Sequence, residues 1–155
     1  MSGEAAGSGG AAKPGAQEVR AASPHQLLQP EGWSAPLGYA NGVAGRGRAV
    51  FVAGQVGWNP QSEIFASDDL AAQVEQALRN VVAVLRTGGA LPHHLVRLTW
   101  YITDGDAYIE SRAAIGAAYR AVVGRHFPAM SVVVVESLLE PRAKVEIEAT
   151  ALVPE

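Results

Sequence analysis

The fold expected of this chain is decided by two stretches, FPAMSVVVVE at residues 127–136 and KVEIEATALV at residues 144–153. The first is an unbroken apolar run with β-branched valines at 132–135, which usually indicates a strand buried on both faces. The second alternates, so that Glu146 and Glu148 point to one face and their apolar neighbours point to the other. We therefore expect two strands that pair with each other. Two acidic side chains on one face of an apolar strand mark a place to look for chemistry.

Composition excludes several classes of function. The chain has 155 residues, and 15 acidic against 12 basic side chains give a formal net charge of −3, with no dense Lys/Arg block. We expect no nucleic-acid partner, because such binders carry a basic patch. The absence of cysteine excludes disulfides, thiolate metal ligands and a cysteine nucleophile. The sequence shows neither a long apolar span nor a secretory signal pattern, so we expect no membrane partner and a cytoplasmic protein.

The chain divides into a tail and one folded region. Residues 1–23 are rich in Gly, Ala and Ser and have no apolar period, which predicts a disordered tail. Residues 24–155 are expected to form a single α+β domain, which begins with an extended arm punctuated by prolines. Within it, apolar periodicity predicts strands at 38–43, 48–56, 95–103, 127–136 and 144–153, and helices from Ser67 to Gly88 and from 107 to 123.

This element order, ββαβαββ, predicts a mixed sheet of about six strands with two helices on one face. The glycines of Gly45-Arg46-Gly47 favour a hairpin between the first two strands. Ser67 is the expected cap of the first helix, and Gly88–Gly89 are expected to end it. The second face of the sheet would remain apolar and uncovered, so we expect a homo-oligomer in which sheets pack together.

These features together resemble the Rid family (reactive intermediate deaminases, YjgF-type proteins) over residues 36–153. The resemblance implies a chorismate-mutase-like α+β subunit, a homotrimer with a central barrel, and no cofactor. It places small-molecule clefts between neighbouring subunits. Family members that act on imines hydrolyse an enamine or imine to a keto acid and ammonia. The residues that carry the resemblance are PLGY at 36–39, VFVAGQ at 50–55, Asn59-Pro60, the helix from Gln73 to Gly89, FPA at 127–129 and VEIEA at 145–149.

Three positions match the family site: Tyr39, Gly54 and Glu146. The resemblance implies that Gly54 and its strand neighbours supply backbone hydrogen-bond donors to the cleft. Imine hydrolysis needs a positioned water and a proton for the departing nitrogen, and a carboxylate in a partly apolar cleft can serve both needs. Glu146 is therefore the catalytic candidate, with a purely structural role as the alternative. Glu148 is expected to be structural or to lie at an interface.

Three other positions of the implied substrate site depart from the deaminases of the family. Met130 replaces the arginine that follows FPA and grips the substrate carboxylate, Gly116 replaces an asparagine three residues before Tyr119, and Val132 replaces a small polar or thiol residue. Methionine offers an adaptable apolar wall in place of a charge-assisted contact. We expect these three residues to bind a substrate without a free α-carboxylate at that point, or a larger and more apolar one. Alternatively, Met130 marks a cleft without catalysis.

Two function classes follow. The first is a hydrolase of an imine, enamine or related C–N bond, and the alternative is a trimer that binds a small metabolite without turnover. An endoribonuclease, a label used in this family, is disfavoured by the acidic net charge. Arg120, Arg125 and Arg142 are candidates to replace the missing arginine, with Arg142 first. No metal site is expected, because the pair His93–His94 has no third ligand at a useful spacing.

Overall fold

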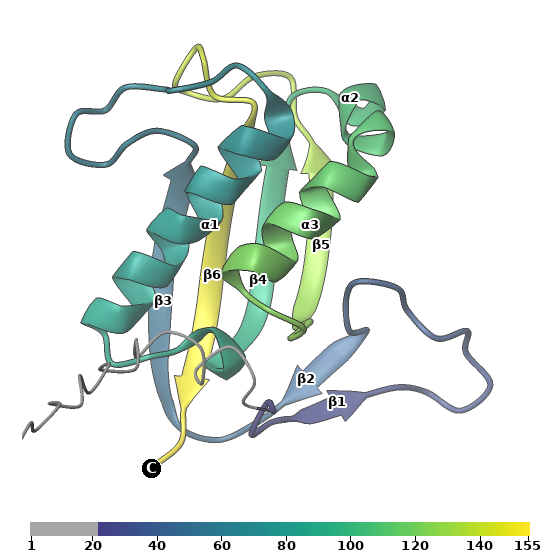
Figure 1. Cartoon of the computed structure of the whole chain (residues 1–155). Coiled ribbons are helices and arrows are strands. Elements are labelled where there is room, and N and C mark those ends of the chain that lie inside the picture. Colours follow the sequence, from purple (N-terminus) through teal and green to yellow (C-terminus); the bar gives the residue numbers. More distant parts are fainter. Residues whose placement is uncertain (1–21) are drawn as a thin grey trace, which may run out of the picture.

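The computed structural model describes residues 22–155, so the predicted tail lies outside the described residues apart from positions 22 and 23. Two helices lie against a four-stranded sheet, and a small two-stranded sheet stands beside it (Figure 1). The elements are, in chain order, β1 (Gln26–Leu28), β2 (Gly42–Ala44), β3 (Arg48–Val56), α1 (Leu70–Thr87), the short 3-10 helix η2 (Pro92–His94), β4 (Leu95–Ile102), α2 (Gly105–Glu110), α3 (Arg112–Val122), β5 (Ala129–Val134) and β6 (Val145–Val153).

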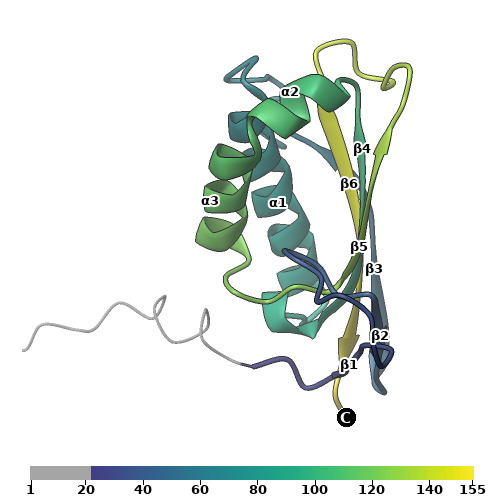
Figure 2. The same ribbon diagram turned by 90° about the vertical axis from the view of Figure 1, so that its right-hand side faces the viewer.

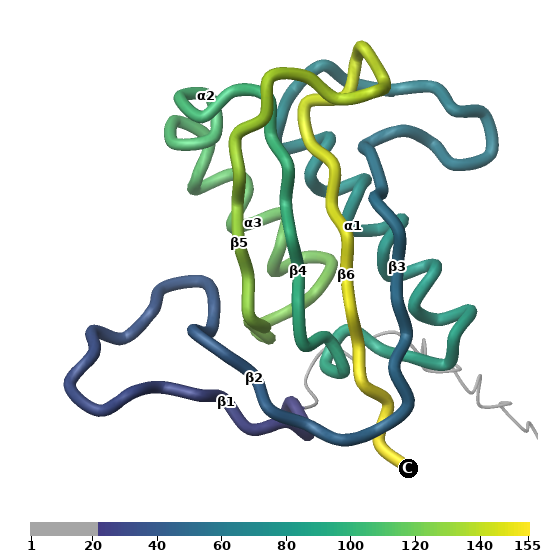
Figure 3. The backbone as a smooth tube through the Cα atoms, turned by 180° about the vertical axis from the view of Figure 1, so that it is seen from behind, coloured from purple at the N-terminus to yellow at the C-terminus, as the bar shows by residue number. Residues whose placement is uncertain are grey.

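The main sheet is mixed, as predicted, with the strand order β3-β6-β4-β5. Strand β6 runs antiparallel to both of its neighbours, whereas β4 and β5 are parallel. Helices α1 and α3 cover one face of this sheet (Figure 2), and from behind the sheet the other face is open in the described part of the chain (Figure 3). The predicted α+β class with helices on one face is therefore confirmed.

The core lies between the helices and this covered face. Leu98 and Trp100 of β4 and Ile147 of β6 are buried there against Leu78 of α1 and Ile115 of α3. In a strand, alternate side chains share a face, so the residues between these positions point to the open face. No helix within residues 22–155 is long and apolar enough to cross a membrane.

The expected pairing between the two C-terminal strands is wrong. Strand β4 lies between β5 and β6, because its two edges bind β5 in parallel and β6 in antiparallel register. Strand β5 is consequently an edge strand, and Val132, Val133 and Val134 are 37%, 44% and 59% exposed rather than buried on both faces. A run of valines indicates a strand, but it does not tell which strands lie beside it.

The predicted single sheet of about six strands is also wrong for the described residues, which form a four-stranded and a separate two-stranded sheet. Strand β2 pairs with β1, with Leu27 opposite Val43, and not with β3. Strand β1 of the extended arm thus takes the place beside β2 that the predicted hairpin had assigned to β3. Gly47, with a φ of +143°, turns the chain so close to β6 that a Cβ atom would meet the carbonyl of Val153.

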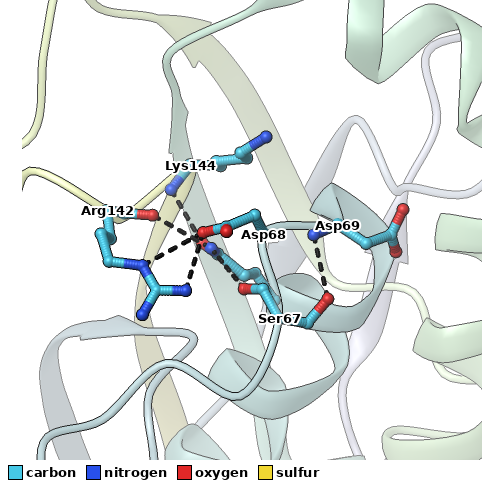
Figure 4. Close-up of polar contacts among 6 residues, drawn as sticks. Ser67, Asp68, Asp69, Arg142 and Lys144 are labelled. Atoms are coloured by element: carbon cyan, nitrogen blue, oxygen red, sulfur yellow. Dashed lines mark hydrogen bonds and ion pairs between the residues drawn. The ribbon is translucent and has the colours of Figure 1, made fainter.

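Helix α1 agrees most closely with the prediction. Its cap is Asp69, whose carboxylate accepts a hydrogen bond from the Ala72 amide at 2.8 Å, rather than the expected Ser67. Ser67 instead accepts a hydrogen bond from the Asp69 amide at 3.0 Å, one step earlier (Figure 4). The helix ends at Gly88, as predicted, and Gly89 adopts a left-handed φ of +72° that favours glycine.

The second predicted helix is divided into α2 and α3, which meet at an angle (Figure 2). The Ser111 amide donates to the Ala107 carbonyl at 3.0 Å, and the Ser111 carbonyl accepts from the Ile115 amide at 2.9 Å. Hydrogen bonding thus continues through the bend, and the two segments form one bent unit. This unit presents α3 to the edge of the sheet at β5.

Candidate functional site

A cavity of about 490 Å³ opens on the helix-covered side of the sheet, between α3, β5 and the segment that precedes β2. Four of the predicted substrate-binding residues line it, namely Tyr39, Gly116, Met130 and Val132. A volume in this range is typical of small-molecule pockets, which run from about 300 to 1,000 Å³. The structure therefore brings together residues that lie far apart in the sequence, from 39 to 132.

Strand register and one loop contact position this set. In the parallel pair β4–β5, Met130 lies opposite Leu98 and Val132 opposite Trp100, so both side chains share the covered face with these buried neighbours. The segment before β2 is held by the Ala40 amide, which donates to the Pro128 carbonyl at 2.9 Å. This hydrogen bond fixes the segment that carries Tyr39 against the start of β5.

Aromatic rings form much of the cavity wall. The Trp100 ring stacks on Tyr119 at 6.3 Å between centroids and meets the Tyr108 ring edge-on at 6.5 Å, and Phe127 stacks on Tyr119 at 5.5 Å. The Tyr119 hydroxyl donates to the His126 carbonyl at 2.6 Å, and burial raises the pKa of Tyr119. These rings offer a broad apolar surface, and the Tyr119 phenol is already committed to the backbone.

Two arginines of α3, Arg112 and Arg120, also line the cavity. Burial raises the pKa of Tyr108, and the positive charge of Arg112 opposes that rise. Sequence reasoning named Arg120 only as a secondary candidate and missed Arg112 altogether. Residues 112, 116 and 120 are spaced by four and share one helix face, but this spacing indicates a binding site only when the cavity beside α3 is known.

Arg142, the first candidate to replace the missing arginine, is occupied elsewhere. Its guanidinium donates to the Asp68 carboxylate at 2.9 Å (Figure 4) and lies over the Phe65 ring, 5.6 Å from the centroid. Arg142 is absent from the cavity wall that contains Met130, whereas Arg120 is part of it. The prediction that put Arg142 first therefore receives no support from the geometry.

Glu146 and Gly54 lie on the other, open face of the sheet. Glu146 is half-buried opposite Tyr101 of β4, and a Cβ atom on Gly54 would collide with the Glu146 carboxylate. An irregularity in the β3–β6 register between Val52 and Gln55 accompanies this close approach. Within residues 22–155 the Glu146 carboxylate has no hydrogen-bond partner, so it is available to a water or a ligand.

Glu148, by contrast, is held in place. The Tyr101 hydroxyl donates to its carboxylate at 3.0 Å, and this hydrogen bond raises the pKa of Tyr101. Glu148 also lines a hollow of about 460 Å³ on the open face, together with Phe51, Arg97 and Thr99. This hydrogen bond anchors the Glu148 side chain on β4, and its structural or interfacial role stays a prediction. The open face is mixed in character rather than purely apolar.

The predicted catalytic residue and the cavity do not meet within one chain. Strand β6, which carries Glu146, is separated from β5 by β4, so it lies about 10 Å from the Met130 strand at the usual spacing of neighbouring strands. Glu146 also points to the face opposite to the cavity. A single copy of the chain therefore does not join the two halves of the predicted site.

The histidines have local roles. The His126 ring donates to the Leu95 carbonyl at 2.7 Å, and burial lowers the pKa of His126 despite that hydrogen bond. His94 accepts a hydrogen bond from the Leu91 amide at 3.0 Å, and burial lowers its pKa as well. Among residues 22–155 there is no group of three His, Cys, Asp or Glu side chains placed to hold a metal ion.

Comparison with known proteins gives consistent relatives. Residues 33–153 match the family model described as Endoribonuclease L-PSP. The chain is 36% identical over 112 residues to protein DfrA of Myxococcus xanthus, covering 68% of this chain and 77% of that protein. It is 35% identical over 118 residues to the 2-iminobutanoate/2-iminopropanoate deaminase of Escherichia coli K12, covering 74% and 86% respectively.

Solved structures agree with the sequence relatives. YyfB from Yersinia pestis, described as a protein of the conserved Rid family, has 36% sequence identity and a TM-score of 0.74, covering 83% of this chain and 98% of that chain. The YjgF gene product of Escherichia coli has 31% identity and a TM-score of 0.59, covering 82% and 98%. The family match spans most of the chain, and the fold of the relatives is the fold described above. This chain belongs to the Rid family of YjgF-type proteins, which also carries the description Endoribonuclease L-PSP.

Proposed function

We propose that this protein is a deaminase that hydrolyses an imine or enamine of a small molecule, without a cofactor, at a site formed between two copies in a homotrimer. The observation that carries the proposal is the division of the predicted site. Glu146 and Gly54 lie on the open face of β6 and β3, whereas Met130 lines the cavity on the covered side at the β5 edge. Only a second copy, whose open face meets this cavity, can combine the two halves.

The open face has the properties that such an assembly needs. Phe51 is 77% exposed and Val133 is 44% exposed there, beside the Tyr101–Glu148 pair. Strand β5 is an uncovered edge among the described residues. Apolar side chains on an uncovered sheet face favour packing against another copy. A closed trimer of such sheets would cover these surfaces and place Glu146 of one copy beside the cavity of the next.

The reaction asks little of the protein. Water adds to the carbon of the C=N bond, and the Glu146 carboxylate accepts a proton from that water. The same carboxyl group returns this proton to the nitrogen, which gives a carbinolamine. It then takes the proton of the carbinolamine hydroxyl and passes it to the nitrogen, so that the C–N bond breaks, the C=O bond forms, and a carbonyl compound and ammonia leave. An enamine reaches the same route after its carbon is protonated to give the imine. Gly54, which has no side chain, lets the Glu146 carboxylate lie directly against the β3 backbone.

The cavity offers no arginine on β5 to bind the carboxylate of a small imino acid, so it favours a different substrate. Met130 and Val132 present apolar surface at the β5 wall, and aromatic rings continue it. We infer a substrate that places no α-carboxylate at Met130. The deaminase activity in the name of the Escherichia coli relative supports the reaction class. Methionine at position 130, where the resemblance implies an arginine in the deaminases, bears on which substrate is bound and not on the reaction.

Glu146→Gln tests the proposal. The substrates are imines made in situ from a panel of amino acids by an amino-acid oxidase, and the readout is protection from semicarbazide trapping. Loss of a general acid–base group is expected to lower turnover by about 10²- to 10⁴-fold. Glu148→Gln is the matched control, because it makes the same change two residues along the same face and should retain most of the turnover.

Binding without turnover is the competing function, and one observation favours it. No side chain among residues 22–155 donates a hydrogen bond to orient the Glu146 carboxylate. For a binding protein, Glu146→Gln would leave the measured property unchanged, and no imine of the panel would be hydrolysed faster than in buffer. Full turnover in Glu146→Gln would remove Glu146 from the proposed mechanism.

A further inference from the structure

Helix α3 presents an unusual face to the cavity. Arg112, Gly116 and Arg120 follow one another at intervals of four residues, so they lie along one side of the helix. All three line the cavity wall. Eight residues of helix span about 12 Å, so this is the spacing of the Arg112 and Arg120 backbones along the helical side of the cavity. No acidic side chain belongs to the wall as the described residues form it, and the two guanidinium groups therefore set the sign of its charge.

Gly116 and Arg120 are coupled by their geometry. A Cβ atom on Gly116 would lie 3.2 Å from the Arg120 Nη1 atom. Helical side chains lean toward the N-terminal end of the helix, so the Arg120 side chain runs back over the position that residue 116 leaves empty. The guanidinium thus occupies space that an asparagine or any larger residue at 116 would restrict. The glycine, which departs from the family pattern, and the arginine form one feature.

Most hydrogen-bond donors of Arg112 and Arg120 have no partner among residues 22–155. Arg120 makes no hydrogen bond or ion pair with any residue from 22 to 155, whereas Arg79 is paired with Glu75 and Arg142 with Asp68. Arg112 donates only through Nε, to the Ile109 carbonyl at 3.3 Å. A guanidinium presents five donors in a planar fork that matches a carboxylate or phosphate. Beside a cavity, these free donors are a means of binding an anionic group.

The rest of the wall defines what accompanies the anion. Trp100, Tyr108, Tyr119 and Phe127 provide stacked and edge-on rings, and Met130 provides a flexible apolar contact. The volume of about 490 Å³ exceeds what an imine of three or four carbons needs. Such a wall binds a planar apolar body by surface burial and ring stacking. The cavity therefore has an apolar side at β5 and a cationic side at α3.

We propose that Arg120, reinforced by the charge of Arg112, binds the anionic group of a substrate whose aromatic or broadly apolar body lies against Met130 and the ring wall. This inference rests on the proposed function and names its substrate class: an aromatic or apolar imine or enamine that carries its anion toward α3. The anion would then be bound at α3, on the wall of the cavity that lies across from Met130.

The test measures selection for charge directly, without turnover. The probes are 3-phenylpropanoate and its uncharged isostere 3-phenylpropanamide, and the full-length protein is titrated with each by calorimetry. Charge-assisted hydrogen bonds to a guanidinium should make the carboxylate bind about tenfold more tightly than the amide. Arg120→Gln should reduce this ratio to about one without weakening amide binding. Arg112→Gln should have about half of this effect in binding free energy, which leaves a ratio of about three.

Arg79→Gln is the matched control, because it removes the same charge from α1, where Arg79 pairs with Glu75 at 2.6 Å. It should keep the preference for the carboxylate. Arg120→Lys should keep part of it, since it retains charge and loses the planar fork. Circular dichroism and gel filtration confirm that each variant is folded and assembled like the wild type. These variants separate the role of the guanidinium from a general change in net charge.

Three outcomes contradict the proposal: equal affinity of the wild type for both probes, no binding of 3-phenylpropanoate at millimolar concentration, or a full preference retained in Arg120→Gln. Its failure is distinguishable from failure of the proposed function. If Glu146→Gln abolishes turnover while Arg120→Gln keeps the preference, the hydrolase stands and the anion site falls. If Arg120→Gln loses the preference while Glu146→Gln keeps turnover, the reverse holds.

Discussion

The two faces of the four-stranded sheet have opposite characters. On the covered face, Leu98, Trp100 and Ile147 are almost completely buried against α1 and α3. On the open face, Phe51 is 77% exposed, and Glu146 and Glu148 stand among hydroxyl-bearing residues. The covered face is a packed core with a cavity at its β5 edge. The open face combines exposed apolar side chains with carboxylates, of which Glu146 has no hydrogen-bond partner among residues 22–155.

This contrast supports the proposed division of the site between two copies. A packed face would give rigidity to a cavity that binds a ligand, and rigid elements position binding groups better than loops. The open face is free to carry a carboxylate, because it is not required to bury its own side chains. The two functions meet only if the open face of one copy closes over the cavity of another. The variants below test that division, from the largest expected effect to the smallest.

Phe51→Asp is expected to have the largest effect. In the proposed interface, a carboxylate in place of the ring would be buried in the hollow that already holds Glu148, and burial of a second negative charge there disfavours assembly. We expect a shift from trimer to monomer at micromolar concentration, measured by light scattering, and a loss of turnover of about 10³-fold as the site halves separate.

Val84→Asp provides the control for Phe51→Asp. Val84 is an exposed valine of α1, 40% accessible, on the helical layer rather than on the open face. It introduces the same charge and should change neither the mass in solution nor the turnover. A monomeric, fully active Phe51→Asp protein would show that the active site is complete within one chain, and the proposed division between the faces would be wrong.

The sequence predicted the elements better than their neighbours. Helix α1 was correctly ended at Gly88, because a positive φ at Gly89 is a local requirement that glycine signals directly. The pairing of β5 with β6 was wrong, because strand order depends on contacts between distant segments that periodicity does not encode. The six-stranded sheet failed for the same reason, since the arm at 26–28 took the place expected for β3 as the partner of β2.

Gly54→Ala should have a smaller but clear effect at the open face. The added methyl group would collide with the Glu146 carboxylate, so this carboxylate must move. Displacement of a reacting group by about 1 Å costs on the order of 10²-fold in rate. We expect that loss in turnover, measured with the same imine panel, and a mass in solution equal to that of the wild type by light scattering.

A double variant sharpens the result for Gly54. In a Glu146→Gln background, Gly54→Ala should cause little further loss, because the two changes act through one group and are not additive. Independent, additive losses would instead show that Gly54 acts on the substrate through its backbone, as the family resemblance implies. Full turnover in Gly54→Ala would contradict any functional coupling between these two residues.

The site was only partly accessible from the sequence. The family resemblance pointed to Glu146 and to the unusual residues Met130 and Gly116. It did not predict that Glu146 lies on the open face of the sheet, whereas Met130 and Gly116 line the cavity on the covered side. That division depends on the register of β4 with both of its neighbours. Arg112 was missed because nothing in an apolar period draws attention to a surface arginine. Its spacing from Arg120 becomes meaningful only when a cavity is seen beside α3.

Arg142→Gln should have the smallest effect, and it separates the two arginine assignments. The Arg142–Asp68 pair is exposed, with side chains 51% and 69% accessible, so its loss together with the contact to Phe65 should lower the free energy of unfolding by about 1 kcal/mol. Urea denaturation measures this change, and turnover should remain at the wild-type level. Arg79→Gln, which breaks a pair within α1, should cost about 0.3–0.5 kcal/mol.

The functional readout of Arg142→Gln bears on the comparison of the faces. Arg142 belongs neither to the cavity wall nor to the Gly54–Glu146 group, because its guanidinium is turned toward Asp68 at the start of α1. A large loss of turnover or of carboxylate preference in this variant would mean that Arg142 reaches the site of a neighbouring copy. Arg142, in the β5–β6 connection, would then bind the anion of the substrate, and the proposal that Arg120 of α3 binds it would be wrong.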